Sequence, residues 1–187
     1  MRIVAGAWRG RALTPVGRGD AGAHLRPTTD RVREALFNVL EGGRFGAPVG
    51  GARVLDLFAG TGALGLEALS RGAAFCCFVE DGRVAGRLVS ANLSLLRVGR
   101  DRARLERRDA TRLGGCEGEP FDLVFLDPPY GKGLGQKALA SARAGGWIAP
   151  GALVVWEESA AMAAPEGFSV LEARRYGDSW VTLLEAE

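Results

Sequence analysis

A glycine-rich segment in the first half of the chain constrains the fold more than any other feature. The apolar run 52–58 leads into Gly60-x-Gly62-x-x-Gly65, and a helical pattern follows over 62–72. A strand, a tight glycine turn and a helix in this order are typical of nucleotide-binding α/β sheets. Glu80 ends the next apolar run, 20 residues after Gly60, where such folds place a ribose-binding acid. The segment therefore predicts a ligand crevice at the carboxyl end of the first strand.

Strand and helix patterns alternate along the rest of the chain. Strands are expected at 52–58, 74–80, 102–109, 121–127 and 151–158, and helices within 26–40, 62–72, 82–98 and 132–146. The apolar segments 168–176 and 179–187 flank a Gly177-Asp178 turn and predict an antiparallel hairpin. The pattern predicts an α/β fold: a seven-stranded, mostly parallel sheet with a C-terminal antiparallel hairpin and helices on both faces.

Length and composition favour a single domain. A chain of 187 residues is most simply one unit, with a basic N-terminal hairpin or arm at 1–25 and an α/β core at 26–187. No segment approaches the roughly 20 apolar residues that span a bilayer. The three cysteines suggest reduced thiols in a cytoplasmic protein, and no Cys or His cluster suggests a metal site.

The charge is unevenly distributed along the chain. Residues 1–33 hold seven Arg and two Asp, 7 − 2 = +5, which leaves 2 − 5 = −3 for the remainder of a chain with net charge +2. A basic arm on a mildly acidic body predicts a polyanionic partner. The cations that we expect to contact RNA phosphates are Arg9, Arg11, Arg26 and Lys132.

Asp56 helps to identify the ligand of the glycine segment. It stands four residues before Gly60, at the end of the first predicted strand. Two unit charges 4 Å apart interact by roughly 1–4 kcal/mol in a partly wet cleft. Asp56 would repel the pyrophosphate of a dinucleotide but attract the ammonium group of S-adenosylmethionine. Asp56 therefore favours S-adenosylmethionine as the cofactor, with Glu80 on the ribose and Asp109 and the Ala110 backbone beside the adenine.

The segment Asp127-Pro128-Pro129-Tyr130 follows the buried strand 121–127 and predicts methylation of an amine. The Asp127 carboxylate and the Pro128 carbonyl can each accept one N–H of an exocyclic amine. These bonds favour a tetrahedral nitrogen whose lone pair is free to attack. Pro129 stiffens the corner, and Tyr130 can stack on a base that has been flipped out of its helix.

These motifs together resemble a known enzyme family. The Asp-Pro-Pro-Tyr tetrapeptide together with "DLFAGTGALG" resembles the class I S-adenosylmethionine-dependent amino-methyltransferases. More narrowly, the segments "RIVAGAWRGRAL", "RPTTDRVREALFNVL", "FLDPPYGKG" and "RRYGDSWVTLL" are similar, in order and spacing, to the bacterial 16S rRNA (guanine(966)-N(2))-methyltransferase family. The resemblance implies a Rossmann-like class I methyltransferase that modifies the N2 amine of a guanine in the small ribosomal subunit. It implies Asp127, Pro128, Pro129 and Tyr130 as the catalytic motif. It implies cofactor contacts at Asp56, Phe58, Gly60, Gly62, Glu80, Asp109 and Ala110.

Two other functions remain open at this point. A DNA adenine-N6 or cytosine-N4 methyltransferase would use the same tetrapeptide, although 187 residues leave little room for a DNA target-recognition domain. A nucleotide-binding oxidoreductase or a non-catalytic RNA-binding protein would not require Asp127. We expect a monomer that acts on ribosomal RNA or on the small subunit, without a metal and without a membrane.

Overall fold

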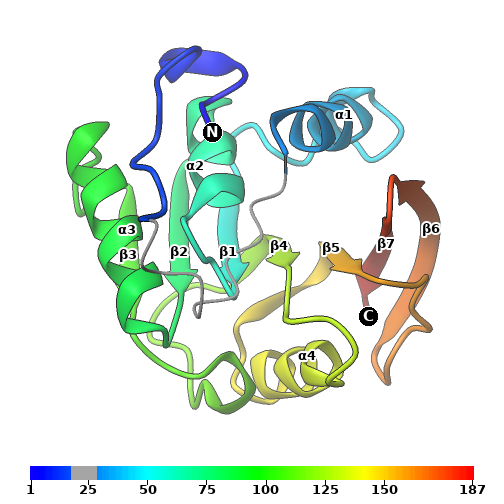
Figure 1. Cartoon of the computed structure of the whole chain (residues 1–187). Coiled ribbons are helices and arrows are strands. Elements are labelled where there is room, and N and C mark those ends of the chain that lie inside the picture. Colours follow the sequence, from blue (N-terminus) through cyan, green and yellow to red (C-terminus); the bar gives the residue numbers. More distant parts are fainter. Residues whose placement is uncertain (18–28) are drawn as a thin grey trace.

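Seven strands form the centre of the computed structural model, which describes residues 1–17 and 29–187. Their bounds are β1 (Arg53–Leu57), β2 (Phe75–Val79), β3 (Ala103–Glu106), β4 (Phe121–Leu126), β5 (Ile148–Glu158), β6 (Phe168–Tyr176) and β7 (Ser179–Ala186). They make one sheet in the order β3-β2-β1-β4-β5-β7-β6. The first five are parallel, and β7 is antiparallel to both β5 and β6 (Figure 1). The predicted sheet and its C-terminal hairpin are confirmed.

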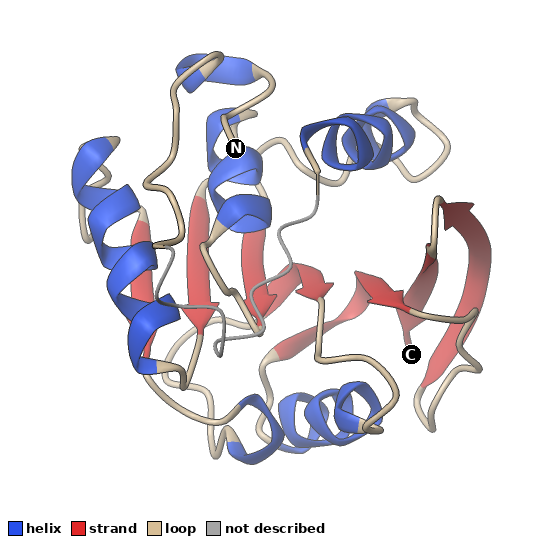
Figure 2. Ribbon diagram, viewed as in Figure 1, coloured by secondary structure: helices blue, strands red, loops and turns tan. Residues whose placement is uncertain are grey.

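Helices cover both faces of this sheet (Figure 2). On one face lie α1 (Asp30–Glu41), α2 (Ala63–Ser70) and α3 (Arg83–Leu95), and on the other lie α4 (Leu134–Ala144) and the short 3-10 helix η3 (Ala110–Arg112). The first face is anchored where the Phe37 ring of α1 meets the Phe125 ring of β4, with 5.6 Å between the centroids. Trp147 and Trp156 are buried and belong to the second face.

Helix α1 begins at Asp30, because the Thr29 side chain caps it by accepting a hydrogen bond from the Val32 amide at 3.3 Å. Leu36, Phe37 and Leu40 are the buried apolar residues of this helix.

Two predicted strands differ from the observed ones in length. The predicted strand 102–109 keeps only Ala103–Glu106 in the sheet, because the Asp109 side chain caps η3 and turns the chain away. The predicted strand 151–158 begins earlier, at Ile148, since Phe121 of β4 pairs with that residue across an irregular register. The first difference places Asp109 beyond the carboxyl end of β3, whereas the second leaves the carboxyl end of β5 at Glu158.

The N-terminal segment is a looser structure than the predicted hairpin of strands. Residues 1–13, all of them described, double back through a single β-bridge between Arg2 and Ala12, and the 3-10 helix η1 (Gly6–Trp8) occupies the turn. The backbone amides of Val4 and Ala5 donate to the carboxylate of Glu67 on α2, at 2.8 and 3.0 Å. Backbone bonds also join the two legs, since the Ile3 amide donates to the Arg11 carbonyl at 2.9 Å and the Leu13 amide donates to the Met1 carbonyl at 3.1 Å.

Glu67 anchors this arm from inside the protein. Its side chain is fully buried and forms salt bridges with Arg71 at 2.8 Å and Arg33 at 3.4 Å. At the other end of the arm, the Thr14 amide donates to Asn92 on α3, and Asn92 donates to the Thr61 carbonyl in the glycine loop. The arm is therefore a fixed part of the α2–α3 face.

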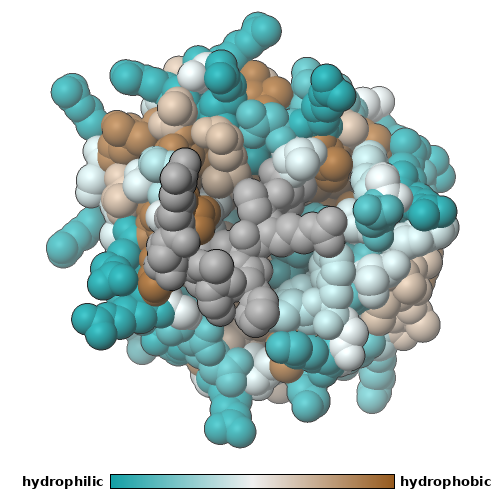
Figure 3. Space-filling view, viewed as in Figure 1, coloured by the Kyte–Doolittle hydropathy of each residue, from teal (hydrophilic) through white to brown (hydrophobic). Residues whose placement is uncertain are grey.

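The chain order creates a switch point at one end of the sheet. From β1 the chain moves outward through β2 and β3, and β4 then returns to the other side of β1. Ligands of open α/β sheets bind at such a switch point, beyond the carboxyl ends of the strands. The face drawn in Figure 3 carries mainly hydrophilic side chains around its rim. Across the described ranges, every helix is too short or too polar to reach through a lipid bilayer.

Candidate active site

Asp56 lies at the switch point and is tied to the helix that follows the glycine loop. Its Oδ2 accepts a hydrogen bond from the Gly65 amide at 3.0 Å, and its side chain is buried. Burial raises the pKa of Asp56 to about 8, and the neighbouring charge of Glu80 adds to this rise, against the opposing effect of the Gly65 bond. Asp56 is therefore largely protonated at neutral pH before any cation binds.

Gly65 is required where α2 packs against the sheet. A Cβ at this position would lie 2.5 Å from Phe78 Cε1, 2.6 Å from the Cys76 sulfur and 2.9 Å from Asp56 Oδ2. Contacts this short leave no room for a methyl group between the helix and β2.

We expect Gly65→Ala to lower the free energy of unfolding by about 1–3 kcal/mol, because the extra carbon overpacks this seam. The melting temperature should fall by about 3–10 °C, measured by calorimetry. Gly50→Ala is the matched control, because its added Cβ has no atom within 4 Å and its φ is not positive. Equal melting temperatures for both variants would contradict this account of Gly65.

The glycine loop and Glu80 hold each other in place. Glu80 Oε2 accepts from the Gly60 amide at 2.8 Å, and its Oε1 accepts from the Gly82 amide at 2.7 Å. Each carboxylate oxygen keeps a second lone pair, which can accept a ribose hydroxyl. Burial raises the pKa of Glu80, and the two amide bonds oppose that rise.

Backbone strain gathers in the same loop. Gly60 and Gly62 have φ of +57° and +80°, and the aromatic residue Phe58 also has a positive φ, of +59°. A left-handed conformation costs a non-glycine residue on the order of 1 kcal/mol and is found most often at functional sites. The placement of Phe58 beside β1 is consistent with its predicted role in cofactor binding.

Asp109 and Ala110 lie beyond the end of β3. Asp109 Oδ1 accepts both the amide and the hydroxyl of Thr111, at 2.8 and 2.7 Å, and these bonds lower the pKa of Asp109. Ala110 is buried in the first turn of η3. Asp109 is thus an ionised acceptor with a fixed position, as a contact to an adenine amine requires.

The Asp-Pro-Pro-Tyr motif follows β4 and leads toward α4 (Figure 1). The Asp127 amide reaches the Leu57 carbonyl of β1 at 3.5 Å, which places Asp127 beside the end of the glycine-loop strand. Pro128 is buried, Pro129 is exposed and Tyr130 is half-buried. Burial raises the pKa of Asp127 well above its usual range, and the charges of Glu157, Asp56 and Glu158 add to that rise. The structure therefore brings the predicted catalytic acid and the predicted cofactor acid together.

Two acids that sequence reasoning missed complete the site. Glu157 and Glu158 end β5, and both are buried. The Tyr130 hydroxyl donates to Glu157 Oε1 at 2.9 Å, and the Gly131 amide donates to Glu158 Oε1 at 3.2 Å. The sequence did contain a signal for these two acids. They stand at the carboxyl end of a strongly apolar predicted strand, as Asp127 does.

A known protein family matches nearly the whole chain. The family described as "Conserved hypothetical protein 95" matches residues 1–185. The chain belongs to this family. Ribosomal RNA small subunit methyltransferase D of Escherichia coli is 44% identical over 158 residues, which are 84% of this chain and 74% of that protein. These findings confirm the resemblance to the rRNA methyltransferases.

Solved structures agree with this family assignment. The Escherichia coli protein yhhF is 37% identical, with a TM-score of 0.81 over 100% of this chain and 98% of that one. A Thermus thermophilus 16S rRNA N2 G1207 methyltransferase, solved with AdoMet and guanosine, has a TM-score of 0.62 at 23% identity. It covers 88% of this chain and 45% of that one, and its likeness concerns the fold alone.

The predicted RNA-contacting cations of this family member are spread over the molecule. Lys132 is exposed directly after the motif, whereas Arg9 and Arg11 are exposed at the far end of α2. The Trp8 amide there donates to the Ser70 hydroxyl at 3.0 Å, and Ser70 is the last residue of the helix that starts at the glycine loop. Arg26 lies outside the described residues.

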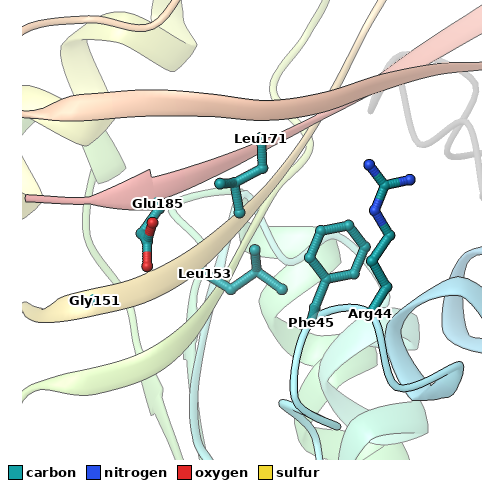
Figure 4. Close-up of a pocket in the computed structure, with 6 residues that line it drawn as sticks. All are labelled: Arg44, Phe45, Gly151, Leu153, Leu171 and Glu185. Carbon is teal, nitrogen blue, oxygen red and sulfur yellow. The ribbon is translucent and has the colours of Figure 1, made fainter.

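A cavity of about 410 Å³ lies away from the motifs of the family. It is bounded by Arg44, Phe45, Gly151, Leu153, Leu171 and Glu185, between the end of α1 and the C-terminal hairpin (Figure 4). None of the predicted site residues borders it, so we do not assign the reaction to it. Within residues 1–17 and 29–187, no group of three or more His, Cys, Asp or Glu side chains is arranged to hold a metal ion.

Proposed function

We propose that this protein transfers the methyl group of S-adenosylmethionine to the N2 amine of a guanine in 16S ribosomal RNA. The observation that carries the proposal is the placement of Asp127 beside Asp56 at the switch point of the sheet, in a chain that belongs to an rRNA methyltransferase family. The substrate class follows from the relatives' names, and a cytoplasmic location follows from that substrate.

The acids of the site fit a cationic cofactor. Among the described residues, none of Asp56, Glu80 and Asp127 is in a salt bridge, although all three are at least partly buried. A buried carboxyl group is costly to ionise without a partner, so a ligand with positive charge would stabilise the ionised forms. Asp56 would hold the ammonium group, Glu80 the ribose hydroxyls and Asp109 the adenine amine.

When bound, S-adenosylmethionine supplies an electrophilic methyl carbon on a sulfonium, which leaves as a neutral thioether. Asp127 and the Pro128 carbonyl accept the two N–H groups of the guanine amine, so that its lone pair points at that carbon. Transfer of the methyl group would leave the amine nitrogen with one proton too many. Its raised pKa makes the Asp127 carboxylate a suitable acceptor for that proton.

Nucleoside analysis of methylated RNA tests this proposal. The protein is incubated with labelled S-adenosylmethionine and small ribosomal subunits that lack N2-methylguanine, and the digested RNA is analysed by mass spectrometry. The label is expected in N2-methylguanosine. Label in methylated adenine or cytosine, or transfer to DNA rather than RNA, would contradict the proposed substrate.

Charge reversal of Arg9 and Arg11 tests the RNA-binding role of the arm. We expect the double Glu variant to bind RNA more weakly and to reduce the slope of log K against log salt by about 1–2, because each lost phosphate contact removes about 0.7–0.9 from that slope. Filter binding at several salt concentrations measures it. Reversal of the exposed Arg143 and Arg175, at the end of α4 and on β6, gives the same charge change. An arm variant with the slope of this control would exclude the arm from the interface.

A further inference from the structure

Glu157 is aligned with the catalytic motif by the register of the sheet. Leu126 of β4 pairs with Trp156 of β5, so Asp127 and Glu157 are the next residues along each strand. The side chains of Phe125 and Val155, two residues earlier, both pack on the face that α1–α3 cover. Since side chains alternate between the two faces of a sheet, Asp127 and Glu157 project to this same face.

The contact between Glu157 and Tyr130 is specific to the hydroxyl of the tyrosine. The phenol donates to Glu157 Oε1 at 2.9 Å, and the carboxylate is buried. A second hydrogen bond joins the next residue of each segment, because the Gly131 amide donates to Glu158 at 3.2 Å. The corner that follows Pro129 is thus fastened to β5 at two successive positions. A ring held at its far end by a buried acceptor has a defined position.

We propose that Glu157 is a positioning residue for methyl transfer, which holds the Tyr130 phenol and thereby the ring against which the target base stacks. The proposal rests on the function proposed above and adds a residue to it. Hydrogen bonds to charged groups are among the stronger ones in proteins. Loss of this contact therefore leaves the ring free to move from its position. Misplacement of the base by about 1 Å can cost about 100-fold in rate.

Glu157 also acts on Asp127 through its charge. The charged groups that face Asp127 are Asp56 from β1, Glu157 and Glu158 from β5, and the Tyr130 phenol from its own loop. After burial, Glu157 contributes most to the raised pKa of Asp127. Removal of this negative charge lets Asp127 ionise at lower pH. The acid limb of the pH–rate profile should therefore move to lower pH when Glu157 loses its charge.

Three variants separate the contact from the charge. Glu157→Ala removes both, Glu157→Gln keeps an acceptor oxygen for the phenol but removes the charge, and Tyr130→Phe removes the bond but keeps the charge. Glu185→Ala, which removes a carboxylate at the opposite end of the sheet, is the control. For each variant, kcat/KM for undermodified ribosomal subunits, the Kd of S-adenosylhomocysteine and the melting temperature are measured.

The Ala and Phe variants are expected to lose about 10- to 100-fold in kcat/KM, corresponding to one hydrogen bond to a charged group. Glu157→Gln should recover most of this loss and should shift the acid limb to lower pH, which Tyr130→Phe should not do. The double variant Tyr130→Phe/Glu157→Ala should lose no more than either single one. A wild-type rate for Glu157→Ala, or a double loss equal to the product of the single losses, would overturn the proposal.

A second readout does not depend on RNA. The chain has two tyrosines, so a Tyr176→Phe background leaves Tyr130 as the only phenol to titrate by ultraviolet absorbance. Burial and Glu157 raise the pKa of Tyr130. Glu157→Ala should return ionisation toward the ordinary value near 10, and an unchanged titration would refute the contact. If the wild-type protein methylates no RNA while this titration shifts, the function is wrong and the contact stands.

Discussion

Replacement of Asp127 with alanine is expected to reduce the rate of methyl transfer to RNA by about 1,000-fold, because the variant loses both an amine acceptor and the proton acceptor. The Kd of S-adenosylhomocysteine should stay within about threefold of the wild-type value, since the carboxylate acts on the amine and not on the methionine moiety. Single-turnover transfer of a labelled methyl group gives the rate, and calorimetry gives the affinity.

Asp127→Asn is the matched control for this experiment. The amide keeps an acceptor oxygen for the amine but cannot take its proton, so we expect a rate between those of the wild type and the alanine variant. An alanine variant that transfers methyl groups at the wild-type rate would remove Asp127 from the reaction. A variant that instead fails to bind S-adenosylhomocysteine would assign Asp127 to the cofactor.

Asp56→Asn is expected to weaken S-adenosylhomocysteine binding by about 100-fold, the value of a strong hydrogen bond to a charged group. The amide oxygen can still accept from the Gly65 amide, so the fold should be kept, and Asp56→Lys should abolish binding altogether. Asp122→Asn is the control, because the Asp122 carboxylate accepts the Arg53 amide at 2.9 Å but is exposed at the amino end of β4. An unchanged Kd for Asp56→Lys would restore the dinucleotide alternative.

The raised pKa of Asp56, about 8, adds a pH dependence to this prediction. An ammonium group requires the ionised carboxylate, so binding in neutral buffer must release a proton. Affinity for S-adenosylhomocysteine should rise about 50-fold from pH 6 to pH 8, since each pH unit below the pKa costs about tenfold. Calorimetry in buffers of different ionisation enthalpy counts the proton, and Asp56→Asn should release none.

The same ionisation affects folding with a defined sign. The pKa of Asp56 is higher in the folded protein than its ordinary value of 3.8, so the folded state holds more protons than the unfolded state between these values. Stability therefore falls as the pH rises through about 4 to 8. Asp56→Asn should lack this loss, so its stability should not fall over this pH range for this reason.

Much of the fold could be predicted from local patterns. A strand, a glycine turn and a helix could be predicted from the spacing of the run 52–58 and of the glycines at 60, 62 and 65. The structure has each of these elements, and Glu80 follows the next strand. The turn at Gly177-Asp178 likewise identified the last hairpin. Such features depend on neighbours in the chain, which the sequence displays directly.

The parts that could not be predicted depend on contacts between distant segments. The attachment of the arm could not be predicted, because the amides of Val4 and Ala5 bind Glu67, which is more than 60 residues away. Glu157 was missed because its place beside the catalytic motif depends on the register between β4 and β5 and on a hydrogen bond from Tyr130. The place of Arg9 and Arg11, at the end of α2 away from the glycine loop, likewise depends on how the arm packs on that helix.

A crystal structure of the protein with S-adenosylhomocysteine provides the most direct test. We expect the ligand beyond the carboxyl ends of β1 and β4, with its amine against Asp56, its ribose against Glu80 and its sulfur facing Asp127. A ligand seated in the cavity beside Phe45 and Leu171, or an Asp127 side chain turned away from the sulfur, would contradict the proposed site.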